Sequence, residues 1–124
     1  MAESITTLRE MCCSPVLAEP LPAPAAQELA GALKVLADPA RLRLLSLIRA
    51  SEGGRAVTRE LVTTLQISQP TVSHHLGVLH DAGFVERERD GRETWYSIVP
   101  ESLQTIRQLL DPYPDRQAPG GAGA

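Results

Sequence analysis

The chain has 124 residues, a formal net charge of −3 and a sequence pI near 5.6. This length supports one domain of about 85 to 90 residues with ragged ends. No apolar run approaches the roughly 20 residues that a membrane span needs, and the N-terminus lacks the basic and then apolar segments of a signal peptide. These features exclude a membrane partner, and we expect a cytoplasmic protein.

The N-terminal part of the sequence reads as an extension that precedes the domain. Residues 4–12 have apolar residues at helical spacing, and residues 14–24 are rich in proline and alanine, which is typical of a linker. Cys12 and Cys13 are the two cysteines of the chain, and in a reducing compartment adjacent cysteines are expected to be free thiols. We therefore divide the chain into an extension at 1–24, a domain at 25–111 and a disordered tail at 112–124.

The domain begins with two predicted helices. Residues 25–37 place apolar side chains on one stripe: Leu29, Ala32, Leu33 and Leu36. Asp38 followed by Pro39 is an N-cap with proline at the first helical position, and the apolar helix that it opens ends near Gly53 and Gly54. Its apolar residues are Leu42, Leu44, Leu45, Leu47 and Ile48. These helices supply the support that shorter elements further along the chain need.

The segment from Ser68 to Gly83 predicts a short helix with a polar face. Ser68 is a good N-cap, Pro70 lies in the first turn, and Gly83 follows the last apolar residue as a stop signal. Val72, Leu76 and Leu79 share one face, and the polar residues lie outside it: Gln69, Thr71, Ser73, His74 and His75. Such groups can bond base edges and phosphates, so we interpret this helix as a DNA-recognition helix.

The helix expected before it completes a helix-turn-helix. Thr58 is the predicted cap of a helix that runs to about Leu65, and the break at Gln66 and Ile67 is short enough for a helix-turn-helix join.

After Gly83 the pattern changes to two extended runs, residues 84–89 and 92–99, around a turn at Asp90 and Gly91. A final helix is expected between Pro100 and Pro112. The fold class is therefore mainly α with a β-hairpin wing, a winged helix-turn-helix. Its core is aliphatic, since the chain holds one Trp, two Tyr and one Phe. The leucine-rich outer helices predict a dimer.

The charge pattern agrees with DNA binding in one region and less well in another. Residues 31–61 carry an excess of basic residues beside the proposed recognition helix: Lys34, Arg41, Arg43, Arg49, Arg55 and Arg59. In the hairpin, arginines alternate with acidic residues, and alternation along a strand places Arg87 and Arg89 on one face and the glutamates on the other. We expect salt-dependent binding.

Two stretches resemble the ArsR/SmtB family of metal- and metalloid-responsive repressors. They are Ala37-Asp38-Pro39-Ala40-Arg41-Leu42-Arg43-Leu44-Leu45 and Ser68-Gln69-Pro70-Thr71-Val72-Ser73-His74-His75-Leu76, followed by Leu79 and Ala82-Gly83. The resemblance covers about Leu29 to Leu110. It implies a homodimeric winged helix-turn-helix repressor that binds a palindromic DNA operator and releases it when an inducer binds. By position, the DNA-binding residues that it implies are Ser68, Gln69, Thr71, Ser73, His74, His75 and, on the wing, Arg92.

Sensor sites in this family differ between members, and the resemblance favours one kind here. A Cys-x-Cys arsenic site before the recognition helix is absent, because residues 55–61 hold no cysteine, and a zinc site on the last helix is absent, because no histidine follows His80. Adjacent cysteines in an N-terminal extension resemble a third, arsenic-responsive kind, although its further cysteine near residues 53–55 is missing. The implied inducer is trivalent arsenic or antimony, inorganic or methylated, held by Cys12 and Cys13.

Alternatives stay open at this point. The third ligand of trivalent arsenic could be a small thiol, a cysteine of the partner protomer or, for a methylated arsenical, nothing. A redox-responsive repressor needs an intermolecular bridge, because neighbouring Cα atoms lie closer than a disulfide normally allows. His74 and His75 point about 100° apart on a helix and do not converge on one metal ion. No resident cofactor and no catalytic group are expected, and we therefore do not expect an enzyme. A winged-helix protein-interaction module is the alternative from another class.

Overall fold

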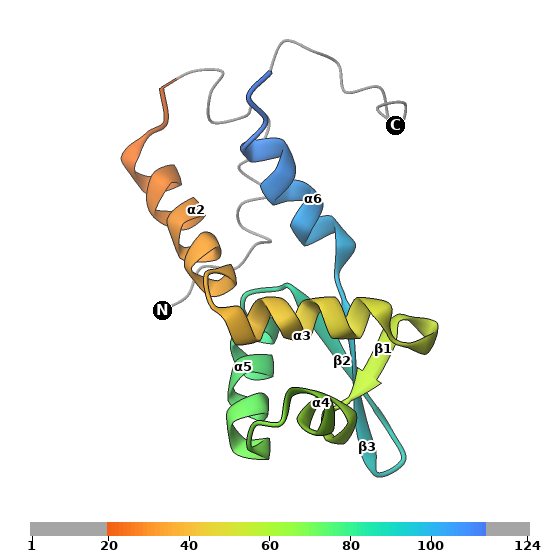
Figure 1. The fold of residues 1–124 in the computed structure, drawn as a ribbon. Coiled ribbons are helices and arrows are strands. Elements are labelled where there is room, and N and C mark those ends of the chain that lie inside the picture. Colours follow the sequence, from red (N-terminus) through yellow and green to blue (C-terminus); the bar gives the residue numbers. More distant parts are fainter. Residues whose placement is uncertain (1–19, 114–124) are drawn as a thin grey trace.

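The computed structural model describes residues 20–113, which form a helical unit with a small sheet (Figure 1). The elements in chain order are α2 (Ala23–Leu36), α3 (Pro39–Ala50), a 3-10 turn η1 (Glu52–Gly54), β1 (Arg55–Val57), α4 (Thr58–Leu65), α5 (Gln69–Asp81), β2 (Val85–Asp90), β3 (Glu93–Ile98) and α6 (Pro100–Leu109). The order helix, helix, helix-turn-helix, hairpin and helix is that of a winged helix-turn-helix, as the sequence predicts.

The sheet has one strand more than the sequence indicates. Its order is β1-β3-β2, and both pairings are antiparallel. The unpredicted strand β1 has three residues, with Ala56 opposite Tyr96 and Val57 opposite Trp95. Three residues are too few to show an alternating pattern, and the partner strand lies far along the chain. The hairpin therefore does not project alone, because β1 fastens it to the chain just before α4.

The first two helices meet at a capped corner. The Asp38 carboxylate accepts hydrogen bonds from the backbone N–H groups of Ala40 at 2.9 Å and Arg41 at 3.2 Å, which confirms the predicted N-cap of α3. Helix α2 begins at Ala23, two residues before the predicted start. Pro24 lies in the first turn, where a missing N–H costs nothing, so it belongs to the helix and not to the linker.

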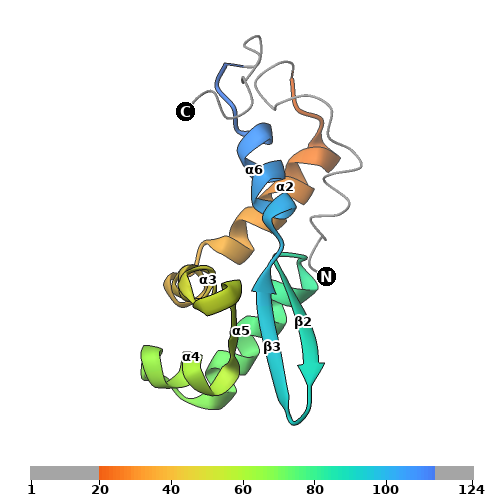
Figure 2. The same ribbon diagram turned by 90° about the vertical axis from the view of Figure 1, so that its right-hand side faces the viewer.

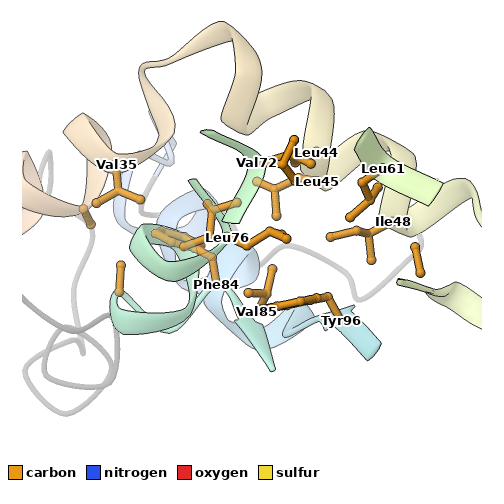
Figure 3. Close-up of a cluster of buried hydrophobic side chains, with 14 of the residues drawn as sticks. Val35, Leu44, Leu45, Ile48, Leu61, Val72, Leu76, Phe84, Val85 and Tyr96 are labelled. Atoms are coloured by element: carbon orange, nitrogen blue, oxygen red, sulfur yellow. The ribbon is translucent and has the colours of Figure 1, made fainter. Parts of the chain in front are cut away.

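Apolar side chains from nearly every element form one core (Figure 3). Its fully buried members include Leu44 and Ile48 of α3, Leu76 of α5 and Phe84 just before β2. Two expected core positions differ, because the stripe of α2 is rotated: Val35 is buried, while Leu33 and Leu36 are half-buried. Leu42 on α3 is 51% exposed, so it does not belong to the core of this chain.

The two ends of the molecule carry different elements. Helices α2 and α6 stand at one end, and α4, the start of α5 and the tip of the hairpin lie at the opposite end (Figures 1 and 2). Large apolar side chains on or beside the outer helices are exposed, with Leu21 at 41% and Leu110 at 45%. Among residues 20–113, no helix is both long enough and apolar enough to cross a membrane.

The end of α5 is hydrogen-bonded to the start of α6. Gly83 adopts φ +89°, its N–H bonds the carbonyl of His80, and the N–H of Phe84 bonds the carbonyl of Leu79. This is the Schellman arrangement of a helix stop, and it confirms Gly83 as the stop signal. Ser102 of α6 is fully buried, and its hydroxyl donates a hydrogen bond to the carbonyl of Gly83. This bond links the end of α5 to α6, next to a second bond from the N–H of Val99 to the carbonyl of Phe84.

Candidate nucleic-acid interface

Helices α4 and α5 are joined by a left-handed turn. Gln66 has φ 59° and ψ 38°, and its N–H donates to the carbonyl of Val62 at 2.8 Å, which ends α4 and redirects the chain. The predicted cap of α4 is wrong. Thr58 is the first helical residue and Val57 is the N-cap, with its N–H bonded to Glu60 Oε1 at 3.5 Å. Val57 stays extended because it is paired with Trp95 of β3, so α4 starts directly after β1.

The start of α5 is capped as the sequence predicts. Ser68 Oγ accepts a hydrogen bond from the backbone N–H of Thr71 at 3.4 Å and donates one to Thr71 Oγ1 at 2.9 Å. Pro70 lies in the first turn. An N-cap of this kind stabilises a helix by about 1 kcal/mol, so the first turn of α5 is held in place although its side chains face solvent.

Two faces of α5 have opposite character. Val72, Leu76 and Leu79 are each 0% exposed and fix the helix on the core. Outside this buried face, the N-cap and the first turns of α5 present exposed polar side chains, namely Ser68, Gln69, Thr71, Ser73 and His74. Gln69 Nε2 donates to Ser73 Oγ at 3.0 Å, so these two side chains are aligned with each other along the helix. This is the arrangement expected of a helix that reads a groove.

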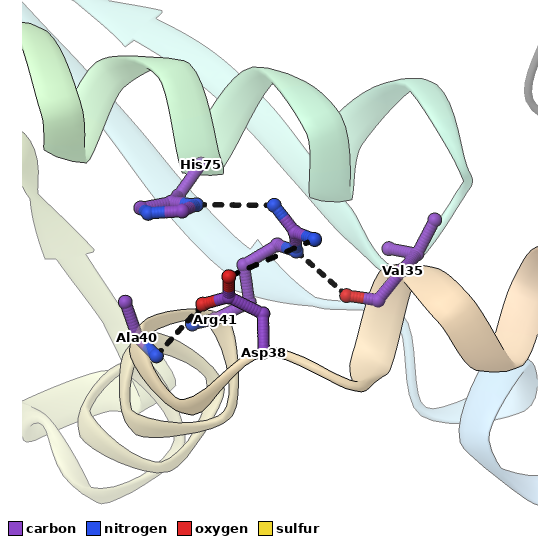
Figure 4. Close-up of polar contacts among 5 residues, drawn as sticks. All are labelled: Val35, Asp38, Ala40, Arg41 and His75. Atoms are coloured by element: carbon purple, nitrogen blue, oxygen red, sulfur yellow. Dashed lines mark hydrogen bonds and ion pairs between the residues drawn. The ribbon is translucent and has the colours of Figure 1, made fainter.

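His75, which the sequence analysis groups with these residues, is bonded within the protein. It is half-buried, and its Nδ1 lies 3.1 Å from Nη1 of Arg41 on α3 (Figure 4). Arg41 Nε also donates to the carbonyl of Val35 at 2.7 Å, and Nη2 lies 3.9 Å from Asp38 Oδ2. Sequence reasoning gave Arg41 no individual role, because its partner is 34 positions away.

The wing differs from the prediction by one residue. Asp90 is paired with Glu93, so the two turn residues are Gly91, with φ +67°, and Arg92. A glycine at the first position of a two-residue turn adopts this φ without strain. Arg92 is therefore exposed at the tip of the hairpin, where a wing residue can meet a phosphate.

Strand alternation sorts the hairpin charges as expected. Arg87 lies opposite Tyr96, and Arg89 lies opposite Thr94, on the face that is continuous with buried Val85. Glu86 and Glu88 lie on the other face. The arginines are thus on the side of the sheet that continues into the core at Val85 and Tyr96, and both are exposed beyond it.

Several of the basic residues near the recognition helix are engaged inside the chain. Arg59 of α4 forms an ion pair with Glu93 of β3, with Nε 2.9 Å from Oε2, and this hydrogen bond raises the pKa of Arg59 above its usual value. The guanidinium of Arg55 stacks 4.1 Å from the centre of the Trp95 ring. With Arg41, these make three of the six basic residues that the sequence analysis placed beside the recognition helix.

The predicted sensor residues lie outside the structure described here. Cys12 and Cys13 precede residue 20, so their role stays a prediction. Within residues 20–113 there is no group of three or more His, Cys, Asp or Glu side chains that could hold a metal ion. The rings of His74 and His75 lie 5.6 Å apart and tilted by 57°. His80 lies beside Asp81 in the last turn of α5.

A capped helix with an exposed polar face, a helix-turn before it and a hairpin beside it define a winged helix-turn-helix protein of the DNA-binding class. Comparison with known proteins narrows this class. The profile of the arsR family of bacterial regulatory proteins matches residues 38–87. The arsenical resistance operon repressor of Staphylococcus xylosus is 39% identical over 85 residues, which cover 68% of this chain and 79% of the repressor. The chain belongs to the ArsR family of transcriptional regulators, and it is not an enzyme.

Solved structures agree with this assignment. A possible transcriptional regulator for arsenical resistance is 34% identical, with a TM-score of 0.58 over 66% of this chain and 82% of that one. The homodimeric winged helix-turn-helix domain of Mb0332 from Mycobacterium bovis shares the fold at 24% identity, with a TM-score of 0.59 over 71% of this chain and 80% of that one.

Proposed function

We propose that the protein is a homodimeric, cytoplasmic repressor that binds a palindromic DNA operator and releases it when trivalent arsenic or antimony binds Cys12 and Cys13. The observation that carries the DNA-binding part is the exposed polar face of α5 above fully buried Val72, Leu76 and Leu79. A helix whose buried face is packed on the core in this way can enter the major groove without rearranging the core.

Dimer formation is supported by the apolar side chains that the single chain leaves exposed. Leu21 precedes α2 and Leu110 follows α6, at the end of the molecule away from α5's first turn. Two copies joined at that end would present two recognition helices to successive major grooves of one operator. Light scattering after gel filtration should therefore give twice the chain mass of 13.4 kDa.

The arsenic part is supported by the chemistry of two adjacent thiols and by the arsenical resistance repressors among the relatives. Thiolates are soft ligands that suit trivalent arsenic and antimony. Inducer and operator must each weaken the binding of the other by the same factor, which is commonly about 1 to 3 kcal/mol of coupling free energy.

Fluorescence anisotropy with DNA from the promoter of the gene tests both parts. The wild-type protein should bind this DNA better than a scrambled duplex, with affinity falling as salt rises. Arsenite, methylarsenite or antimonite should release it, and zinc, cadmium and peroxide serve as comparisons. The C12S/C13S variant should bind the operator normally and stay bound in arsenite.

Three outcomes would contradict the proposal. Arsenite release that persists in C12S/C13S would refute the sensor and leave the DNA-binding part intact. Release by peroxide alone would favour a redox-responsive repressor. If the wild-type protein shows no preference for the promoter DNA, the alternative of a protein-interaction module is favoured.

A further inference from the structure

The Arg41 contact determines which nitrogen of His75 carries a proton. A guanidinium has five N–H donors and no acceptor, so in a hydrogen bond between Arg41 Nη1 and His75 Nδ1 the histidine nitrogen must accept. Nδ1 then bears no hydrogen. In a neutral imidazole the proton is therefore on Nε2, at the opposite edge of the ring from Arg41 (Figure 4).

The nitrogen that carries this proton is accessible. Among residues 20–113, the hydrogen-bond partner of the His75 ring is Arg41, which uses Nδ1. Nε2 of His75 has no hydrogen-bond partner in this part of the chain. It is not fully buried either, because the fully buried side-chain polar atom without a partner there is Glu28 Oε2, so Nε2 of His75 reaches solvent. A donor N–H on the recognition helix is thus available to a group outside the chain.

Arg41 itself is held in a fixed orientation. Its side chain is 15% exposed, and its planar group contacts three elements: the carbonyl of Val35 at the end of α2, the carboxylate of Asp38 at the α2–α3 corner, and His75 on α5. A lysine ammonium is a point charge on a flexible stem and cannot reproduce this planar set of contacts.

We propose that Arg41 is a positioning residue for DNA recognition. It fixes His75 in its Nε2–H form, so that this N–H donates a hydrogen bond to an acceptor atom of DNA. The inference rests on the proposed function, and it gives His75 a defined role as a donor. Arg41 acts through His75 and does not itself have to touch DNA.

The first test needs no DNA. Long-range ¹H–¹⁵N correlation spectra distinguish the two neutral forms of an imidazole, and the His75 signals can be assigned by their loss in H75Q. We expect the Nε2–H pattern in the wild-type protein and a mixture of both forms in R41A and R41K. A Nδ1–H pattern in the wild-type protein, or an unchanged pattern in both variants, would overturn the proposal.

The second test separates the two nitrogens by operator binding. H75N keeps an acceptor oxygen near the Nδ1 position and loses the Nε2 donor, so we expect operator affinity to fall about tenfold, the effect of one lost hydrogen bond to a charged or well-aligned acceptor. H75Q places an amide N–H near the Nε2 position and should stay within about threefold of wild type. Equal affinities of H75N and H75Q would contradict a donor role.

Two arginine variants complete the design. R41K keeps the positive charge and should still lose about tenfold in operator affinity. R43A removes a charge from an exposed position on the same helix. It should weaken the binding of operator DNA and of scrambled DNA by the same factor. A loss in H75N on both DNAs identifies a phosphate acceptor, and a loss on the operator alone identifies a base. If the wild-type protein binds no operator, the proposed function fails, and the spectra of the free protein still decide whether Arg41 fixes the ring.

Discussion

Replacement of Ser102 by alanine tests the joint between α5 and α6. The Ser102 hydroxyl is fully buried and donates to the carbonyl of Gly83, at the stop of the recognition helix. In S102A that carbonyl loses its donor, and a buried acceptor without a partner costs about 1 to 3 kcal/mol. Gly83, the accepting residue, is only half-buried, so we expect the lower half of this range, about 1 to 2 kcal/mol.

This loss is large enough to measure. For a domain of this size, 1 kcal/mol corresponds to a change of roughly 4 to 8 °C in Tm, so S102A should melt roughly 4 to 16 °C below wild type. Calorimetry or circular dichroism at one fixed protein concentration measures it, because the Tm of a dimer depends on concentration.

The matched control is S46A. Ser46 lies on α3 and is exposed, so this variant gains the same helix propensity without losing a buried contact. Its Tm should equal or slightly exceed that of wild type. If S102A melts together with S46A, the bond between α6 and Gly83 contributes nothing, and the coupling inferred for these two helices is wrong.

Three further variants test the features that hold the recognition unit. L76A removes a side chain that is 0% exposed, and urea unfolding should show a loss of about 2 to 5 kcal/mol. G83A places a Cβ at φ +89° and should cost more than about 1 kcal/mol in the same assay, with G83N less affected because asparagine tolerates this conformation. In D38N, stability near neutral pH should stay close to wild type, since asparagine also caps helices, while the pH dependence below about 4 should be weaker.

The sign of the D38N effect follows from the cap. The hydrogen bond from the backbone N–H of Arg41 is the main cause that lowers the pKa of Asp38 below 3.8, and desolvation opposes it. A carboxyl with a lowered pKa stabilises the fold at pH values above its unfolded pKa, and this contribution disappears as the pH falls through the folded value. The Tm of wild type should therefore fall relative to that of D38N below pH 4. A Tm difference between wild type and D38N that stays constant down to pH 2 would contradict this. The other two predictions would be contradicted by an L76A variant that loses less than about 1 kcal/mol and by a G83A variant as stable as wild type.

Local signals in the sequence predicted most of the recognition unit. The cap at Ser68, the stop at Gly83 and the spacing of Val72, Leu76 and Leu79 each depend on neighbours within a few positions, and the structure confirms all of them. The wing turn was misplaced by one residue, because strand register and not the Asp-Gly pair alone decides which two residues remain unpaired.

Contacts between distant positions could not be predicted. Arg41 with His75 and Arg59 with Glu93 each join residues 34 positions apart, and no local pattern of the sequence marks either pair. Strand β1 was missed for the same reason, since its three residues are defined by their partners on β3. As a result, three of the basic residues counted near α5 have partners within the chain that the sequence does not indicate.

The ion pair between Arg59 and Glu93 has a consequence for the thermodynamics of operator binding. In the free protein Arg59 already has a counterion, which is a carboxylate of its own chain. A DNA phosphate that pairs with Arg59 displaces Glu93 from it and releases no anion bound from solution. Release of anions from the protein would therefore contribute little to the salt dependence of operator affinity at this contact. The exchange also removes the side-chain link between α4 and β3, so that the pairing of β1 with β3 becomes the remaining connection described here between the start of α4 and the hairpin.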